Sequence, residues 1–181
     1  MTSIRVYHPL KTPQALILCY IKLVNKGNNH KNTLTGIISI SSKGTGYVAV
    51  GDDKKKGEDP EVDFKHLHTA LHGDMVEILL HPKGKDRQTA EVTRITKRAK
   101  MRFAGVLEEE NGMLFLKPDD TKMYTDILIH KDSQHLAKVG QKVFVEIISW
   151  KDANKAPIGK VIKILGQPGD NNTEMHAIAM E

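Results

Sequence analysis

The sequence LHTALHGDMVEI, residues 67–78, has a counterpart in QHLAKVGQKVFV, residues 134–145. Both segments hold Ala and Gly at the same spacing and continue into a run of mainly aliphatic residues. Three more pairs of segments recur in the same order, at offsets of 67 to 69: residues 35–38 with 104–107, 46–50 with 114–118, and 90–95 with 159–164. Four ordered matches at a nearly constant offset predict two copies of one module of about 65 residues.

Each copy has the pattern of short strands. Residues 74–81, 142–149 and 158–165 alternate with a period near two, and clusters of Gly and Asp between such runs are typical of turns. Only one piece per copy looks helical; in the first copy Leu67, Ala70 and Leu71 have helical spacing, and Gly73 follows where a helix end favours positive φ. Five strands with a short helical turn between the third and fourth predict an all-β fold of two tandem OB-type barrels.

The period-two rule also assigns the faces of the second strand in each copy. Lys43 and Tyr47 fall on one side, and small or apolar residues such as Val48 fall on the other, which we expect to line the barrel. In the second copy, Phe115 and Lys117 are expected outside. An exposed aromatic ring beside a lysine can stack on a base while the lysine neutralises a phosphate. The alternative, that Tyr47 and Phe115 pack under a loop or against the other module, stays open.

The formal net charge of +5 is a poor guide to function because of where it lies. Residues 1–33 hold five basic and no acidic residues, and the rest of the chain holds 22 of each. Residues 94–102, however, hold five positive charges and no acid: Arg94, Lys97, Arg98, Lys100 and Arg102. We expect this run to bind phosphates. The alternative is a solvated edge strand whose charges deter aggregation.

Composition excludes several classes of protein. A single cysteine, Cys19, allows neither an internal disulfide nor a cysteine zinc site and favours a reducing compartment, so we expect a cytoplasmic protein. The longest apolar stretch, residues 15–24, is too short to cross a membrane. His66, His68 and His72 do not share one helical face, His81 lies a little farther along the chain, and no neighbouring carboxylate completes a ligand set, so we expect no metal site. We expect a monomer without a small-molecule cofactor.

Two short motifs carry a resemblance to a known family. Residues 43–48, KGTGYV, look like the RNA-binding strand motif of cold-shock domains, and residues 127–130, ILIH, resemble their second motif, which ends at His130. The tandem arrangement over residues 34–178 resembles the N-terminal half of ribonuclease R, in the ribonuclease II family of 3′-to-5′ exoribonucleases. Thr45 and Leu128 depart from the motifs, which have an exposed Phe at both positions. The resemblance therefore implies backbone-dominated contacts with less base stacking.

The resemblance implies a division of the chain. Residues 1–33 form a basic N-terminal segment of unknown role, residues 34–101 and 102–166 form two cold-shock-like OB domains, and residues 167–181 form a tail that leads in that family into the catalytic domain. The family's catalytic aspartates, which bind divalent metal such as Mg²⁺, have no counterpart in this sequence. We therefore expect an N-terminal piece or a shortened relative of a bacterial-type exoribonuclease, with no catalytic residues and no nuclease activity of its own.

The predicted function is to guide single-stranded RNA to a catalytic domain. Two alternatives remain at this point, namely a stand-alone cold-shock-type protein that binds single-stranded nucleic acid, and an OB module that binds protein. The candidate RNA-binding residues come from both copies and from the basic run between them: Lys43, Tyr47, Arg94, Lys97, Arg98, Lys100, Arg102, Phe115, Lys117 and His130.

Overall fold

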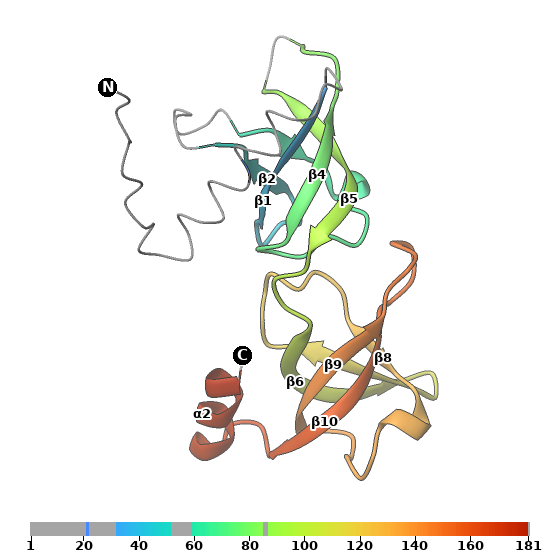
Figure 1. The fold of residues 1–181 in the computed structure, drawn as a ribbon. Helices are drawn as coiled ribbons and strands as arrows, with labels where there is room; N and C mark the ends of the chain where they lie inside the picture. Colours follow the sequence, from blue (N-terminus) through green and yellow to red (C-terminus); the bar gives the residue numbers. More distant parts are fainter. Residues whose placement is uncertain (1–20, 22–31, 52–58, 85–86, 181) are drawn as a thin grey trace, which may run out of the picture.

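The strands form two closed five-stranded barrels, which confirms the predicted fold class (Figure 1). The computed structural model describes residues 21, 32–51, 59–84 and 87–180, so most of the basic N-terminal segment lies outside the described residues. The first barrel consists of β1 (Thr33–Ile40), β2 (Gly46–Ala49), β3 (Glu61–Val62), β4 (Met75–Leu80) and β5 (Thr89–Lys97). The second consists of β6 (Arg102–Glu110), β7 (Met113–Pro118), β8 (Ile127–Ile129), β9 (Lys142–Ser149) and β10 (Ile158–Gly166).

The two barrels share one strand order. Neighbouring strands run β1-β2-β3-β5-β4 in the first barrel and β6-β7-β8-β10-β9 in the second, and each barrel closes by pairing its first strand with its fourth. In each, the third and fifth strands pair in parallel, as β3 with β5 and β8 with β10, while the other pairs are antiparallel. Because closure leaves no open sheet edge, a module of this size satisfies its own backbone hydrogen bonds.

A short 3₁₀ helix lies between the third and fourth strands of each barrel, η1 (Phe64–His66) and η2 (Lys131–Ser133). The helical spacing at Leu67, Ala70 and Leu71 does not correspond to an α-helix. These three side chains are buried, and successive tight turns space them, for example where the Ala70 N–H donates to the Leu67 carbonyl at 3.0 Å. A single turn of chain buries residues at i, i+3 and i+4 just as a longer helix does, so the predicted short helical turn is confirmed, as 3₁₀ and tight turns.

The repeat extends to the backbone conformation. His68 and His135 are both at φ 54°, and Gly73 and Gly140 are at φ 86° and 85°. The expectation of positive φ at Gly73 is therefore confirmed, although Gly73 follows a tight turn and not the end of an α-helix. Gly105 shows a second constraint, because a Cβ there would lie 2.1 Å from the carbonyl oxygen of Lys117 on the paired strand β7. Such close approach of two strands requires glycine at this position.

Each barrel encloses its own hydrophobic core. In the first, Val48, Val62 and Ile78 are fully buried, and in the second Leu107, Leu116 and Ile127 are. The alternation predicted for the second strand of each copy is confirmed, since Val48 and Leu116 face inward. No helix in the part of the chain that the structure describes is long and apolar enough to cross a membrane.

The C-terminal tail folds onto the second barrel, which the sequence interpretation did not predict. Helix α2 (Asn171–Met180) follows β10 and lies beside that barrel (Figure 1). Ala177 packs against Ala104 and Phe144, and the ammonium of the buried Lys142 pairs with Glu174 of the helix and with Asp119 at 2.9 Å. Burial opposes the charge of Lys142, but the Glu174 and Asp119 carboxylates outweigh it and raise the pKa of the ammonium.

We expect acid to loosen α2 from the barrel. The Lys142 ammonium, together with the Gly169 N–H, lowers the pKa of Glu174 below its ordinary value of 4.5. A carboxyl group whose pKa is lower in the folded state stabilises that state above the unfolded pKa, and the contribution is lost as pH falls through the folded pKa. Nuclear magnetic resonance of the Ala177 methyl group from pH 7 down to 3 should show release below about pH 4.5, the ordinary value. In the Glu174→Gln variant the Ala177 methyl signal should no longer change over this pH range. The same pH-dependent change in that variant would show that Glu174 is not the group that titrates.

Candidate nucleic-acid interface

The outer face of β2 carries the residues expected to contact RNA on the first barrel. Lys43 is exposed in the turn before β2, where the Gly44 N–H donates to the Ser41 carbonyl at 2.9 Å. Tyr47 is half-buried on the strand, opposite Ser39 of β1 and Glu61 of β3. The two side chains project outward as predicted.

An arginine missed by the sequence interpretation covers the Tyr47 ring. The guanidinium carbon of Arg87 lies 5.1 Å from the ring centroid, and Arg87 also pairs with Glu61 at 3.8 Å. A guanidinium over a phenol face is a cation–π contact, and both groups are ones on which bases stack. Arg87 lies 40 residues along the chain from Tyr47, so only the barrel closure reveals their proximity.

A second aromatic ring, Phe64 of η1, lies against the same motif. A Cβ on Gly44 would meet the Phe64 ring at 3.1 Å, so the motif glycine leaves room for this ring. Phe64 is 56% exposed, an unusual state for a phenylalanine. Thr45 lacks the aromatic ring of the family motif, but Phe64 places a ring against the neighbouring Gly44. We call the surface formed by these residues the first-barrel face; it consists of Lys43, Tyr47, Phe64 and Arg87.

The equivalent face of the second barrel is more acidic. Phe115 of β7 is half-buried between Glu108 of β6 and Leu128 of β8, its direct partners across the strands. Lys117 is exposed but lies 3.8 Å from a Glu108 carboxylate oxygen. Glu109 and Glu110 are also exposed on β6. Burial first, and then the neighbouring Glu108 carboxylate, raise the pKa of Asp126.

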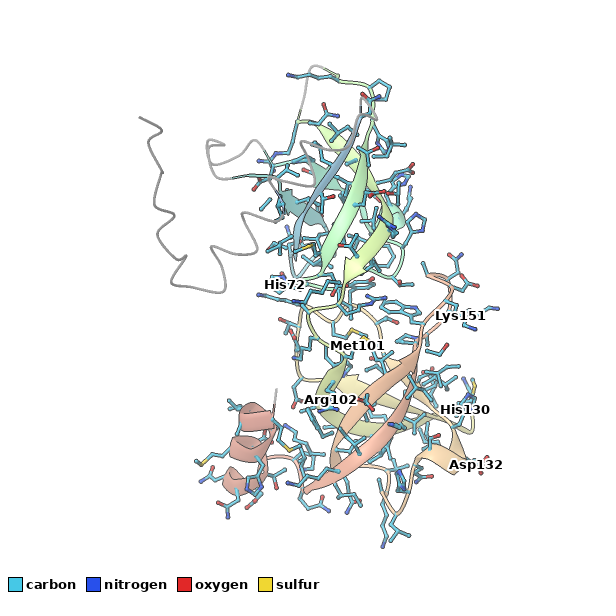
Figure 2. All side chains as sticks on the ribbon, in the orientation of Figure 1. His72, Met101, Arg102, His130, Asp132 and Lys151 are labelled. Carbon is cyan, nitrogen blue, oxygen red and sulfur yellow. The ribbon has the colours of Figure 1, made fainter. Side chains whose placement is uncertain are left out.

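His130 follows β8 at the rim of the second barrel (Figure 2). It is exposed, and with Met113, Leu128 and Lys131 it lines a shallow hollow of about 150 Å³. Leu128 lies opposite Phe115 on the paired strand, so the surface has an apolar hollow where the family motif has a ring.

The basic run does not form an unpaired positive surface. Acidic residues from other parts of the fold pair with four of its five members: Arg94 with Glu77 at 3.2 Å, Arg98 with Asp74 at 2.8 Å, Lys100 with Asp120 at 3.1 Å, and Arg102 with Glu146 at 3.0 Å. Lys97 is exposed at the end of β5, opposite Met75. Exposed pairs are weak, so phosphates can compete for Arg94 and Arg102, whose side chains are 68% and 60% exposed.

Arg98 is built into the first barrel. Its guanidinium bonds Asp74, whose side chain is fully buried, and it also donates to the carbonyl and hydroxyl of Thr69. The Asp74 carboxylate in addition accepts the Leu71 N–H at 2.9 Å and the Ala99 N–H at 2.8 Å. A buried carboxylate with this many partners holds the turn after η1 against the end of β5. The structure thus gives Arg98 a structural role where the sequence suggested a phosphate contact.

The second barrel shows what the equivalent turn does without a charge. Gln141 stands in the place of Asp74, and its side-chain carbonyl accepts the Lys138 N–H at 2.8 Å. This bond repeats the one from Leu71 to Asp74 in the first barrel. Both turns therefore have a hydrogen-bond acceptor at this position. The negative charge on that acceptor is specific to the first barrel, where the Arg98 guanidinium pairs with it.

Side chains from both barrels meet at the junction. The Tyr124 hydroxyl donates to the Ala70 carbonyl at 2.9 Å, and its ring packs edge-on against Phe64 with centroids 5.4 Å apart. The same ring lies at a tilt to Trp150, with centroids 5.9 Å apart. Burial raises the pKa of the Tyr124 phenol, so it stays a neutral donor. His72 lies at the same junction (Figure 2), with Lys122 Nζ 3.0 Å from its Nε2. These contacts couple the first-barrel face to the second barrel through Phe64.

Comparison with known proteins identifies the relatives of this architecture. The family model described as "Cold shock domain" matches residues 115–181. Ribonuclease R of Thermotoga maritima is 29% identical over 139 residues, and that of Vibrio cholerae is 31% identical over 135 residues. The resemblance to ribonuclease R is confirmed. These alignments cover 76% and 73% of this chain but only 19% and 16% of the two relatives, so the chain spans less than a fifth of their length.

Solved structures of ribonuclease R agree with the barrels. The apo form of the Mycoplasma genitalium enzyme matches with a TM-score of 0.70 and 26% identity, over 81% of this chain and 24% of that one. The same enzyme in complex with ribose-methylated single-stranded RNA gives the same values. Yeast Ssd1, described as a pseudonuclease, matches over 92% of this chain with a TM-score of 0.66 and 20% identity, which shows a shared fold alone.

Proposed function

We propose that this chain binds single-stranded RNA and guides it, as the tandem cold-shock region of a ribonuclease R-like 3′-to-5′ exoribonuclease. The observation that carries the proposal is the first-barrel face, where two aromatic rings and two basic side chains gather on and beside the family's RNA-binding strand motif. The Mycoplasma genitalium relative bound to single-stranded RNA supports the same assignment. Residues 34–101 and 102–166 would act as two modules in a cytoplasmic, monomeric protein.

The two modules would contribute unequally to RNA binding. Their net charges are similar, because residues 34–101 hold 12 basic and 10 acidic residues and residues 102–166 hold 10 basic and nine acidic, so the difference lies in where the acids stand. Glu108, opposite Phe115, repels a phosphate backbone, and Glu109 and Glu110 are exposed on the same strand, whereas Glu61, the acid opposite Tyr47, is paired with Arg87. The first barrel would therefore hold the RNA more strongly, with Phe115, Lys117 and His130 as secondary contacts.

Catalysis would belong to another part of such an enzyme. Within residues 32–51, 59–84 and 87–180, no three carboxylates lie within ligating distance of one another, as hydrolysis with two metal ions requires. The Mg²⁺ of the family would accordingly act in a catalytic domain and not on these barrels.

The salt dependence of RNA binding tests the proposal. We expect a fluorescently labelled pyrimidine RNA of about 15 nucleotides to bind at low salt and to lose affinity as salt rises, because each neutralised phosphate adds roughly −0.7 to the slope of log K against log salt. Fluorescence anisotropy at several salt concentrations measures this. A labelled single-stranded DNA of the same sequence is the matched control for sugar preference. Absence of binding even at the lowest salt would overturn the proposal and favour a module that contacts protein.

A further inference from the structure

Two histidines and a glutamate converge on the first barrel. His66 ends η1, His81 follows β4, and Glu91 lies on β5. The atoms with which they could bind a metal all lie within 4.8 Å of one another. His66 Nδ1 is 3.6 Å from a Glu91 carboxylate oxygen, and the two imidazole rings meet edge to face with centroids 5.3 Å apart. Sequence spacing indicated no carboxylate near these histidines, and strand pairing supplies one.

The backbone places the three residues independently of any ligand. Strands β4 and β5 are antiparallel, with Leu79 opposite Glu91, and the His81 N–H donates to the Thr89 carbonyl at 3.0 Å. The helix η1 is capped by Asp63, whose carboxylate accepts the Lys65 N–H at 3.0 Å. Three separate elements therefore present one side chain each to a common point.

A neighbouring hydroxyl orients one of the rings. Thr89 Oγ1 lies 3.2 Å from His81 Nδ1, which leaves Nε2 as the nitrogen available to a metal. Histidine ligands in proteins are commonly held in this way by a group on the other ring nitrogen. The three side chains are half-buried, and a hollow of about 300 Å³ lined in part by His66 and His81 admits solvent and a water ligand.

We propose that His66, His81 and Glu91 bind a divalent transition metal, with Zn²⁺ the best match. Two imidazoles and one carboxylate are a donor set of Zn²⁺, whereas Ca²⁺ and Mg²⁺ prefer oxygen ligands alone. Zn–N bonds of about 2.0–2.1 Å require the ligand atoms to draw closer than they stand now. Half-buried side chains permit that movement by rotation about their own bonds. The bound ion would tie η1 to β4 and β5 and so stabilise the first barrel.

The second barrel provides an internal comparison. Ser133 and Lys160 occupy the places of His66 and Glu91 in the repeat. Neither can complete this ligand set, and a lysine would repel the ion. The site therefore belongs to the first barrel alone among the described residues, and it is not a by-product of the repeated architecture.

Cobalt and zinc titrations of the metal-stripped full chain test the site. We expect one Co²⁺ to bind with visible absorption bands of a low-coordinate nitrogen and oxygen site, and Zn²⁺ to displace it. His66→Ala, His81→Ala and Glu91→Gln should each weaken binding by about tenfold or more. His176→Ala, at an exposed histidine on α2, is the matched control and should leave the affinity unchanged.

Imidazole resonances separate this site from binding elsewhere on a chain with nine histidines. In the unaltered protein, Zn²⁺ should shift the ring signals of His66 and His81, and this measurement does not depend on whether a variant folds. Zinc should also raise the melting temperature of the first barrel, by an amount that grows with its concentration. Shifts confined to other histidines, or affinity retained in all three ligand variants, would overturn the proposal.

Discussion

Arg98→Ala should destabilise the first barrel by about 3–5 kcal/mol, the loss typical of a buried ion pair from which one partner is removed. The Asp74 carboxylate is fully buried, whereas the Arg98 side chain is 26% exposed. Removal of the guanidinium leaves that carboxylate with only the Leu71 and Ala99 amides as partners. A loss of this size is a large fraction of the 5–15 kcal/mol that stabilises a typical domain.

Arg102→Ala is the matched control for this prediction. It removes an arginine from the same basic run, and it also breaks an ion pair, with Glu146, but its side chain is 60% exposed. We expect a loss of at most about 1 kcal/mol there, since exposed pairs contribute little. Urea denaturation followed by amide hydrogen exchange in β4 and β9 distinguishes the two barrels. The assignment fails if both variants unfold the first barrel at the same urea concentration.

A second substitution separates the charge of Asp74 from its hydrogen bonds. The double variant Asp74→Asn with Arg98→Ala removes both charges and keeps a side-chain carbonyl as acceptor, as Gln141 does in the second barrel. We expect it to recover part of the stability that Arg98→Ala loses, because no buried charge is left unpaired. A double variant no more stable than Arg98→Ala would show that the guanidinium acts by packing and not by its charge.

Sequence patterns predicted the barrels because local rules repeat within each module. The alternation around Val48 and Leu116 follows from the period-two geometry of strands, and a closed barrel leaves only one face for apolar side chains. Gly73 and Gly140 recur because both turns need the same positive φ. These features depend on residues close together in the sequence, so the residue pattern within a single module is sufficient to predict them.

The pairing of the charged side chains could not be predicted from the sequence. The partners of Arg94, Arg98 and Arg102 lie 17, 24 and 44 residues away and reach them only across paired strands. The same holds for Arg87 over Tyr47 and for Glu91 beside His66. A run without acids in the sequence therefore became a set of ion pairs in the structure. Helix α2 escaped prediction because it buries only Thr173 and Ala177, too few for a clear apolar stripe.

Tyr47→Ala should weaken binding of single-stranded RNA by roughly tenfold or more, since a stacked base contributes about 1–3 kcal/mol. The loss has two parts in this structure. The phenol ring itself is removed, and Arg87 loses the surface over which its guanidinium lies 5.1 Å away. Fluorescence anisotropy with a labelled pyrimidine RNA at fixed low salt measures the change, and circular dichroism confirms that the barrel is folded.

Two variants make the result specific to the ring. Tyr47→Phe keeps the stacking face and the cation–π contact, so its affinity should stay close to that of the unaltered chain. Phe115→Ala removes the equivalent ring from the second barrel, where Glu108 faces it across the strands, and should cost less than Tyr47→Ala. The order of affinities then reports which barrel holds the RNA. Equal losses from Tyr47→Ala and Phe115→Ala would contradict the unequal division. If neither substitution alters the affinity, stacking on these two rings is excluded, and any RNA binding rests on other contacts such as Phe64 and the basic side chains.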